Sequence, residues 1–316
     1  MEALVESVLR TFSARNMKIT SSSPSPRLGR RPERGKFRST CWKKWSKVAA
    51  ARDQFRRVAE RYAKSRAHSD KRFLSRIVAF AQPRKGERVL DVATGPGFVG
   101  VEFAKKGVEV VGTDITMEML THAKELRRRN SAMMELVLAE ASRQPFRGET
   151  FDIAVSRLAF HHMKEPAKAV ESMTSLVKPG GRIVVADLVV SEDDGVADFH
   201  NRFERFRDPS HVRTLKLTEW KTIFRGLGLR LEQVGLSKVR LEVVEWARRA
   251  GFPEDRIREL VYMLETAPLK AKRSLSAFHR NGLMFFLNTR AILVGTKRRQ
   301  PPVRRPFART RRMIKK

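Results

Sequence analysis

Cysteine is nearly missing from this chain of 316 residues, which contains only Cys41. A single cysteine can form no internal disulfide and cannot supply a zinc cluster, so we expect neither a disulfide scaffold nor a metal site. Long apolar runs are missing too. None approaches the roughly 18 residues that a membrane-spanning helix needs, so we expect no transmembrane span. Glu6 and Ser7 interrupt the apolar residues near the start, which argues against a secretory signal.

Acidic residues are scarce, because 34 Asp and Glu stand against 66 Lys and Arg and give a net charge of +32. The excess lies at the two ends, since residues 1–52 and residues 297–316 each carry a net charge of +10. We predict a basic, largely disordered N-terminal extension over 1–52 and a basic C-terminal tail over 298–316. Such tails bind nucleic acid or an anionic surface, or stay solvated, and the sequence leaves all three open.

The low cysteine content also bears on the compartment. It favours a reducing environment, and we expect a cytoplasmic protein. Residues 7–52 are rich in Arg and Ser, however, so an organelle transit peptide stays open as the alternative. The sequence does not predict the oligomeric state.

Between the tails, residues 53–297 alternate between strand and helix patterns. Such alternation predicts an α/β fold, here a Rossmann-like, doubly wound, seven-stranded and mostly parallel sheet. Two segments, about 191–217 and 240–281, interrupt the pattern, and we expect them to form a helical cap over the carboxyl edge of the sheet, where ligands bind. The expected strands are 88–93, 108–113, 134–139, 151–156, 182–188, 229–236 and 284–297, and the expected helices are 70–81, 98–106, 117–129, 166–177 and 218–227.

A glycine-rich turn follows the first expected strand and has the sequence Gly95-Pro-Gly-Phe-Val-Gly100. Three glycines between a strand and a helix are typical of nucleotide-binding turns, including those for nicotinamide cofactors. Asp91 lies just before the turn and would repel a pyrophosphate, but it would attract a cationic cofactor. Pro96 removes one backbone donor that a phosphate would use. Asp114 ends the second strand and can accept hydrogen bonds from ribose hydroxyls, which suits either cofactor.

With these residues in place, the chain resembles the class I S-adenosylmethionine-dependent methyltransferases. The most similar branch is that of the ubiquinone and menaquinone C-methyltransferases and their uncharacterised small-molecule relatives, and the resemblance covers about residues 53–297. It rests on these segments in this order: Phe55-Arg-Arg-Val-Ala-Glu-Arg-Tyr62, Val89-Leu-Asp-Val-Ala-Thr-Gly-Pro-Gly97, Gly112-Thr-Asp114, Pro145-Phe146, Phe151-Asp152, His161-His162 and Leu176-Val-Lys-Pro-Gly-Gly181.

The resemblance implies S-adenosyl-L-methionine as the cofactor and assigns residues to it by position. The methionine part would meet the glycine-rich turn and an N-terminal helix, and the adenosine part would meet the ends of the second and third strands. Ala93 stands where the family has its first glycine, and Glu140 stands where the family usually has Asp. The implied cofactor residues are Tyr62, Arg66, Asp91, Ala93, Thr94, Gly95, Gly97, Asp114, Ile115, Met119, Glu140, Ala141, Ser156 and Arg157.

Two histidines are the candidate bases. His161, followed by His162, comes after the fourth strand, where a side chain can relay a proton or simply begin a helix. His211 lies in the first cap segment, and the alternative for it is a polar loop in which Asp208 pairs with Arg213. For Arg157 the sequence leaves three roles open: it contacts the adenosine, it contacts the acceptor, or it pairs with Glu140.

Methyl transfer depends mainly on aligning the donor with the acceptor, so no single catalytic signature is required. Cys41 lies outside the core, which argues against a cysteine nucleophile for cytosine methylation. An Asn/Asp-Pro-Pro-aromatic run is absent after the fourth strand, where Ser156-Arg-Leu-Ala-Phe160 stands instead. We therefore expect methyl transfer to an O, C or N nucleophile of a small molecule. The alternatives are an RNA-associated methyltransferase that uses its basic tails and an NAD-dependent oxidoreductase.

Overall fold

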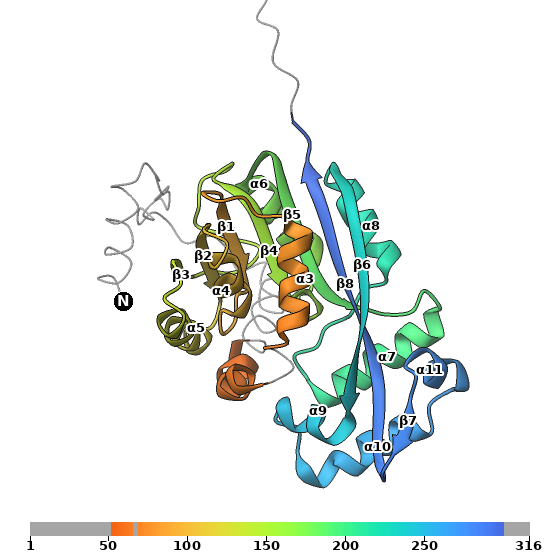
Figure 1. Cartoon of the computed structure of the whole chain (residues 1–316). Helices are drawn as coiled ribbons and strands as arrows, with labels where there is room; N and C mark the ends of the chain where they lie inside the picture. The colour runs from red at the N-terminus through yellow and green to blue at the C-terminus, as the bar shows by residue number, and fades with distance from the viewer. Residues whose placement is uncertain (1–51, 66–68, 300–316) are drawn as a thin grey trace, which may run out of the picture.

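The computed structural model describes residues 52–65 and 69–299. Figure 1 shows a central sheet with helices on both faces and a second group of helices below it. The predicted tails 1–52 and 298–316 lie almost wholly outside the described residues. No helix in the described ranges has the length and apolar content that a bilayer crossing requires.

The sheet confirms the predicted α/β class. Its seven long strands run in the order β3-β2-β1-β4-β5-β8-β6, and the short β7 pairs only with β8. Strands β3, β2, β1, β4 and β5 are parallel, whereas β8 is antiparallel to both β5 and β6. The bounds are β1 Arg88–Val92, β2 Glu109–Asp114, β3 Met134–Leu138, β4 Phe151–Arg157, β5 Val177–Val189, β6 Leu229–Glu242, β7 Phe278–Arg280 and β8 Leu283–Lys297.

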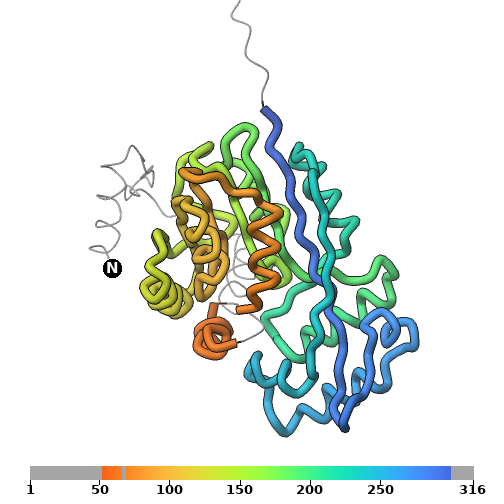
Figure 2. The backbone as a smooth tube through the Cα atoms, in the orientation of Figure 1, coloured from red at the N-terminus to blue at the C-terminus, as the bar shows by residue number. Residues whose placement is uncertain are grey.

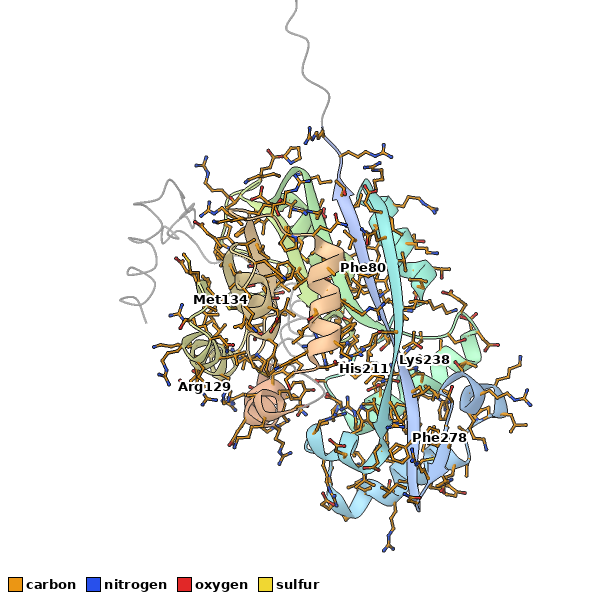
Figure 3. The ribbon with its side chains drawn as sticks, viewed as in Figure 1. Phe80, Arg129, Met134, His211, Lys238 and Phe278 are labelled. Atoms are coloured by element: carbon orange, nitrogen blue, oxygen red, sulfur yellow. The ribbon has the colours of Figure 1, made fainter. Side chains whose placement is uncertain are left out.

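Helices cover the two faces of the sheet because the inner strands are apolar on both sides. One face packs against α3 (Lys71–Ala81), α4 (Phe98–Ala104) and α5 (Met117–Arg129), and the other against α6 (Pro166–Leu176) and α8 (Leu217–Gly226). In α3 the apolar residues recur at helical spacing, and the carboxylate of Asp70 accepts bonds from two backbone N–H groups at its start. Figure 3 shows Phe80 of this helix pointing toward β6 and β8.

The cap consists of α7 (Asp194–Arg207), α9 (Val243–Arg249), α10 (Ile257–Glu265) and α11 (Leu269–Ser274). It has an apolar core of its own, in which Phe203, Trp246 and Phe286 pack together. The tube in Figure 2 shows β6 and β8 running side by side from the main sheet into this cap. The cap is therefore a continuation of the sheet as well as a helical layer.

Two strand boundaries differ from the sequence-based expectation by more than two residues. Strand β6 continues to Glu242 instead of ending near 236, because Val239–Glu242 pair with Phe285–Asn288. Strand β5 begins at Val177 instead of near 182, and it is irregular there: its register against β4 shifts between Phe151 and Ile153. The helix expected over 117–129 has the bounds predicted for it.

Candidate functional site

The glycine-rich turn lies at the carboxyl end of β1 and is organised by two carboxylates. Asp91 accepts a hydrogen bond from the Thr94 hydroxyl at 2.6 Å and another from the Gly100 N–H at 2.9 Å. Asp114, at the end of β2, accepts from the Gly95 N–H at 2.9 Å. The two strand ends are thus tied to one turn, as the nucleotide-binding interpretation requires.

Three residues of this turn have a positive φ: Ala93 at 55°, Gly95 at 54° and Gly97 at 89°. Glycine adopts such angles readily, whereas alanine pays a steric penalty, so Ala93 is strained where the family has glycine. A Cβ on Gly97 would lie 3.1 Å from that of Ala123, but a Cβ on Gly95 would meet no atom within 4 Å. Gly97 is required for helix packing, and Gly95 borders open space.

Burial makes Asp91 an unusual carboxylate. The residue is 1% exposed, and burial raises the pKa of its side chain to about 7, against the opposing hydrogen bonds from Thr94 and Gly100. Asp114 is also buried, and its pKa is raised for the same reason. Two buried carboxylates at one strand edge favour the binding of a cation, because a cation would stabilise the ionised form of each.

The predicted adenosine side comes from β2, β3 and α5. The Thr116 N–H donates to the second oxygen of Asp114 at 2.9 Å, Met119 is buried in α5, and Ile115 is half-buried. Glu140 is exposed just after β3 and accepts a hydrogen bond from the Ser142 hydroxyl at 2.6 Å. Ala141, beside it, is half-buried and packs against the apolar core.

The structure describes only part of the N-terminal helix that we predicted to contact the cofactor. Residues 52–64 are helical, and Tyr62 lies on this helix against Phe55, with 5.9 Å between the ring centroids. Burial, followed by the negative charge of Asp208, raises the pKa of Tyr62 to about 12, so its hydroxyl stays protonated. Arg66, the other predicted residue here, lies outside the described residues.

Ser156 and Arg157 end β4 beside the turn. Ser156 is fully buried, and its hydroxyl has no hydrogen-bond partner in the part of the chain that the structure describes. Arg157 forms no ion pair with Glu140, so that interpretation of the sequence is wrong; its guanidinium instead lies 5.8 Å from the ring centroid of Phe73 on α3. The Nε and Nη2 atoms of Arg157 are buried without a partner among the same described residues.

His161 is paired with a carboxylate that the sequence analysis did not identify. Its Nδ1 lies 2.6 Å from Asp187 Oδ1, near the end of β5, and the Phe160 N–H donates to the other oxygen at 2.7 Å. Burial alone would lower the pKa of His161, but the charge and hydrogen bond of Asp187 outweigh it and the pKa is raised. Burial alone would raise the pKa of Asp187, but the charge and hydrogen bond of His161, together with the backbone bonds from Leu188 and Phe160, outweigh it and the pKa is lowered. When the imidazole is neutral, this pairing places its proton on Nδ1 and leaves Nε2 as the basic nitrogen.

His211 lies 5.6 Å from His161, centroid to centroid, and Figure 3 places it where the sheet meets the cap. Its Nε2 is 3.0 Å from Asn201 Oδ1, and the Asn201 amide donates to the carbonyls of Ala197 and Thr214. The amide oxygen therefore faces His211, which places the imidazole proton on Nε2 and leaves Nδ1 buried without a partner. The proposed pairing of Asp208 with Arg213 is wrong, because Arg213 pairs with Glu219 at 2.7 Å.

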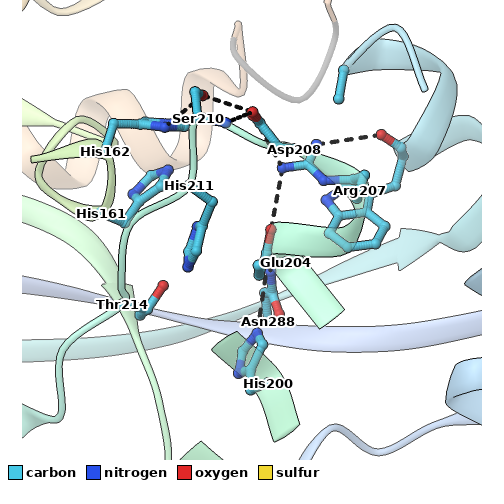
Figure 4. Close-up of polar contacts among 12 residues, drawn as sticks. His161, His162, His200, Glu204, Arg207, Asp208, Ser210, His211, Thr214 and Asn288 are labelled. Atoms are coloured by element: carbon cyan, nitrogen blue, oxygen red, sulfur yellow. Dashed lines mark hydrogen bonds and ion pairs between the residues drawn. The ribbon is translucent and has the colours of Figure 1, made fainter. Parts of the chain in front are cut away.

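The three histidines differ in charge. Burial, followed by repulsion from His161, lowers the pKa of His162 to about 4. Burial lowers the pKa of His211 to about 3. Both rings are neutral at pH 7, whereas His161 has Asp187 to stabilise its charged form. Figure 4 shows the three rings from η1 (Phe160–His162) and the 208–214 loop gathered in one place.

The same close-up shows a second polar group that sequence reasoning missed (Figure 4). Glu204 on α7 accepts from Arg207 at 3.1 Å and from Asn288 on β8 at 2.9 Å. Arg207 lies over the Trp246 ring at 4.2 Å. One sequence signal could have revealed these residues: a polar residue in an otherwise apolar strand, such as Asn288 in β8 and Asp187 in β5. Buried polar groups are kept only where they are paired or used, so such residues mark a buried polar site.

A surface groove of about 340 Å³ borders the turn at Pro96 and Phe98. Helix 52–64 and α5 supply its other walls, through Glu60, Ala63, Lys64, His122, Glu125, Leu126 and Arg129. Neither His161 nor His211 lines it. The groove therefore lies away from the candidate bases, and none of the predicted cofactor residues that the structure describes lines it.

Comparison with known proteins agrees with this geometry. Residues 90–185 match a family described as a methyltransferase domain. An uncharacterized methyltransferase of Bacillus subtilis, YcgJ, is 29% identical over 247 residues, which cover 77% of this chain and 98% of that protein. Its crystal structure superposes with a TM-score of 0.69 over 73% of this chain and all of that one.

Two further relatives match shorter stretches. The uncharacterized protein YafE of Escherichia coli is 33% identical over 149 residues, which cover 46% of this chain and 70% of that protein. A demethylmenaquinone methyltransferase of Paenarthrobacter aurescens is 37% identical over 113 residues, 35% of this chain and 43% of that enzyme. The matched stretches, the sheet order and the carboxylate-bearing turn lead to one assignment: the chain belongs to the class I S-adenosylmethionine-dependent methyltransferases.

Proposed function

We propose that this protein transfers a methyl group from S-adenosylmethionine to a small-molecule acceptor. The observation that carries the donor assignment is the pair of buried carboxylates, Asp91 and Asp114, bonded into one turn. The residues fit the cofactor, because Asp91 suits its ammonium group, Asp114 suits its ribose, and Gly95 borders space for its thioether chain. The bound cofactor would supply a methyl group already activated by a positive sulfur.

The other cofactor residues are proposed from their positions around this turn. Thr94, Gly97 and Ala93 shape the turn itself. Ile115 and Met119 would pack on the adenine, and Glu140 with Ala141 would border its amine. Tyr62 would close the methionine side together with Arg66, and Ser156, whose buried hydroxyl lacks a partner, would contact the donor beside β4.

The acceptor side supports a small molecule. His161 is 8% exposed and His211 is 3% exposed, so a group that reaches either imidazole has to enter an enclosed space. A polymer would need a more open approach. A relative whose name gives demethylmenaquinone as its acceptor supports the same class. An RNA-associated role would depend on the basic tails, which lie outside the described residues.

The proposed chemical role of His161 is that of a general base. Asp187 orients its ring and stabilises the protonated form, and Nε2 would take the proton that an O or N nucleophile, or an acidic carbon, loses as the methyl group arrives. His211 would stay neutral and accept a hydrogen bond at Nδ1, which would orient the acceptor. In-line alignment of donor and acceptor would supply much of the rate.

Isotope-labelled S-adenosylmethionine and a metabolite extract test this proposal. We expect the full chain to transfer the label to a compound of low molecular mass. The Asp114→Ala variant should lose the transfer, because it loses the ribose contact. A label found only in RNA or protein, with none in small molecules, would contradict the small-molecule assignment.

A further inference from the structure

Two arginines meet at the ring of Phe73, between the donor turn and the cap. Arg157 ends β4, and Arg290 lies on β8. Their guanidinium carbons are 5.8 Å and 3.8 Å from the centroid of the Phe73 ring. The Arg290 side chain is only 8% exposed. Two cations therefore share one aromatic ring in a largely buried place.

Neither guanidinium uses all its donors. The Nε and Nη2 atoms of Arg157 and the Nε atom of Arg290 are buried and have no hydrogen-bond partner among residues 52–65 and 69–299. Arg290 donates from Nη2 to Asp70 at 3.1 Å. A buried N–H group without a partner costs free energy, and a charged group costs more, so these donors need a water molecule or a ligand as their partner.

The neighbouring carboxylates do not neutralise Arg157, although Asp70, Asp91 and Asp187 all lie close enough to affect it. Asp70 begins α3 and pairs with Arg290, Asp91 holds the glycine-rich turn, and Asp187 holds His161. Within the described ranges, Arg157 has no ion pair with any of them. Burial, followed by the charge of Arg290, lowers the pKa of Arg157 to about 10, against the opposing charges of Asp91, Asp70 and Asp187.

We propose that Arg157 and Arg290 form a subsite for a carboxylate group, an inference that rests on the proposed methyl transfer. The planar fork of a guanidinium matches the two oxygens of a carboxylate, and the unused N–H groups would become its donors. Two molecules carry such a group: the methionine part of the donor and an acidic acceptor. Arg290 belongs to β8, which lies beyond β5 from the turn after β1, and this favours the acceptor.

The acceptor arm of the test uses benzoate and benzamide, which have similar shapes but differ in charge. Calorimetry with the full chain and saturating S-adenosylhomocysteine should give an affinity for benzoate about tenfold or more above that for benzamide, because charge-assisted bonds are the stronger ones. The Arg157→Gln and Arg290→Gln variants should bring this ratio close to one.

The donor arm uses S-adenosylhomocysteine and its decarboxylated analogue, which keeps the ammonium group. If the ratio between these two ligands falls in Arg157→Gln while benzoate shows no preference, the subsite holds the carboxylate of the donor. If neither arm shows a preference for the carboxylate that these variants remove, the proposal is overturned.

Arg240→Gln is the matched control. Arg240 also lies beside an aromatic ring, 5.8 Å from the centroid of Phe285, but outside this subsite. It should keep both ratios, and an equal loss in this variant would overturn the proposal as well. If Arg157→Gln does not fold, Arg157→Lys takes its place in the test. This variant keeps the positive charge but not the planar fork, so it should retain only part of the preference for the carboxylate. Binding of S-adenosylhomocysteine without any carboxylate preference refutes the subsite alone, whereas a folded chain that binds none refutes the proposed function.

Discussion

Asp91 couples cofactor binding to pH, and the Asp91→Asn variant tests this coupling. Burial raises the pKa of the Asp91 carboxyl group to about 7 in the cofactor-free protein. A bound ammonium or sulfonium group would favour the ionised carboxylate and lower that pKa. Binding below pH 7 therefore requires Asp91 to lose a proton, so the affinity should rise as the pH rises toward 7 and then level off.

The size of the effect follows from the pKa. Well below pH 7, each pH unit should change the affinity about tenfold, and about 0.9 proton should be released per cofactor bound at pH 6. The same group affects the folded state without cofactor. A rise from 3.8 to about 7 means that Asp91 contributes stability at low pH that is lost as the pH rises through 7, roughly 4 kcal/mol in all.

Calorimetry with S-adenosylmethionine between pH 5.5 and 7, in buffers of different ionisation enthalpy, measures both the affinity and the released protons. The Asp91→Asn variant should bind more weakly at pH 7 and should lose most of the pH dependence. Asp114, whose pKa is also raised, would account for any slope that remains. A wild-type affinity that stays constant over this range, or an equal slope in Asp91→Asn, would refute the reasoning.

Three further predictions concern the same site. His161→Asn and Asp187→Asn should each lower kcat about 10²–10⁴-fold at unchanged donor affinity. The wild-type rate should rise with pH through a pKa above 6.5, because only the neutral imidazole of His161 can accept a proton. Equal rates in the wild-type protein and both variants would rule out His161 as the general base. Ala93→Gly should raise the free energy of unfolding in urea by up to about 1 kcal/mol, because it relieves a φ of 55°, and a loss of stability would contradict this. Gly97→Ala should lower stability by about 1–3 kcal/mol, whereas Gly95→Ala, which has only the strain of a φ of 54°, should lower it by about 1 kcal/mol and should also weaken donor binding; a larger loss of stability in Gly95→Ala would contradict the turn geometry.

The sheet and its flanking helices were predictable because their apolar patterns are strong. Strands such as β1 are buried on both faces, so they appear as short apolar runs between turn residues. The cap was harder. The second half of β6 has the sequence Ser-Lys-Val-Arg-Leu-Glu, in which polar and apolar residues alternate, and only its pairing with β8 shows that the strand continues to Glu242. Such pairing depends on residues far away in the sequence.

The donor site was predictable for a related reason. Asp91, Gly95 and Asp114 lie within 24 residues of one another in a compact motif. The candidate base was predicted only in part. His161 was identified by its place after β4, but its partner Asp187 is 26 residues away, and Arg290, which shares the Phe73 ring with Arg157, comes from the last strand. Strands that are distant in the sequence bring such residues together in the sheet, and a single sequence does not reveal the pairs.

Calorimetry with S-adenosylmethionine and with NAD⁺ tests the central claim most directly. We expect the folded chain to bind one S-adenosylmethionine, the Asp114→Ala variant to bind it more weakly, and NAD⁺ to show no measurable binding at the same concentrations. A folded chain that binds NAD⁺ but not S-adenosylmethionine would contradict this claim.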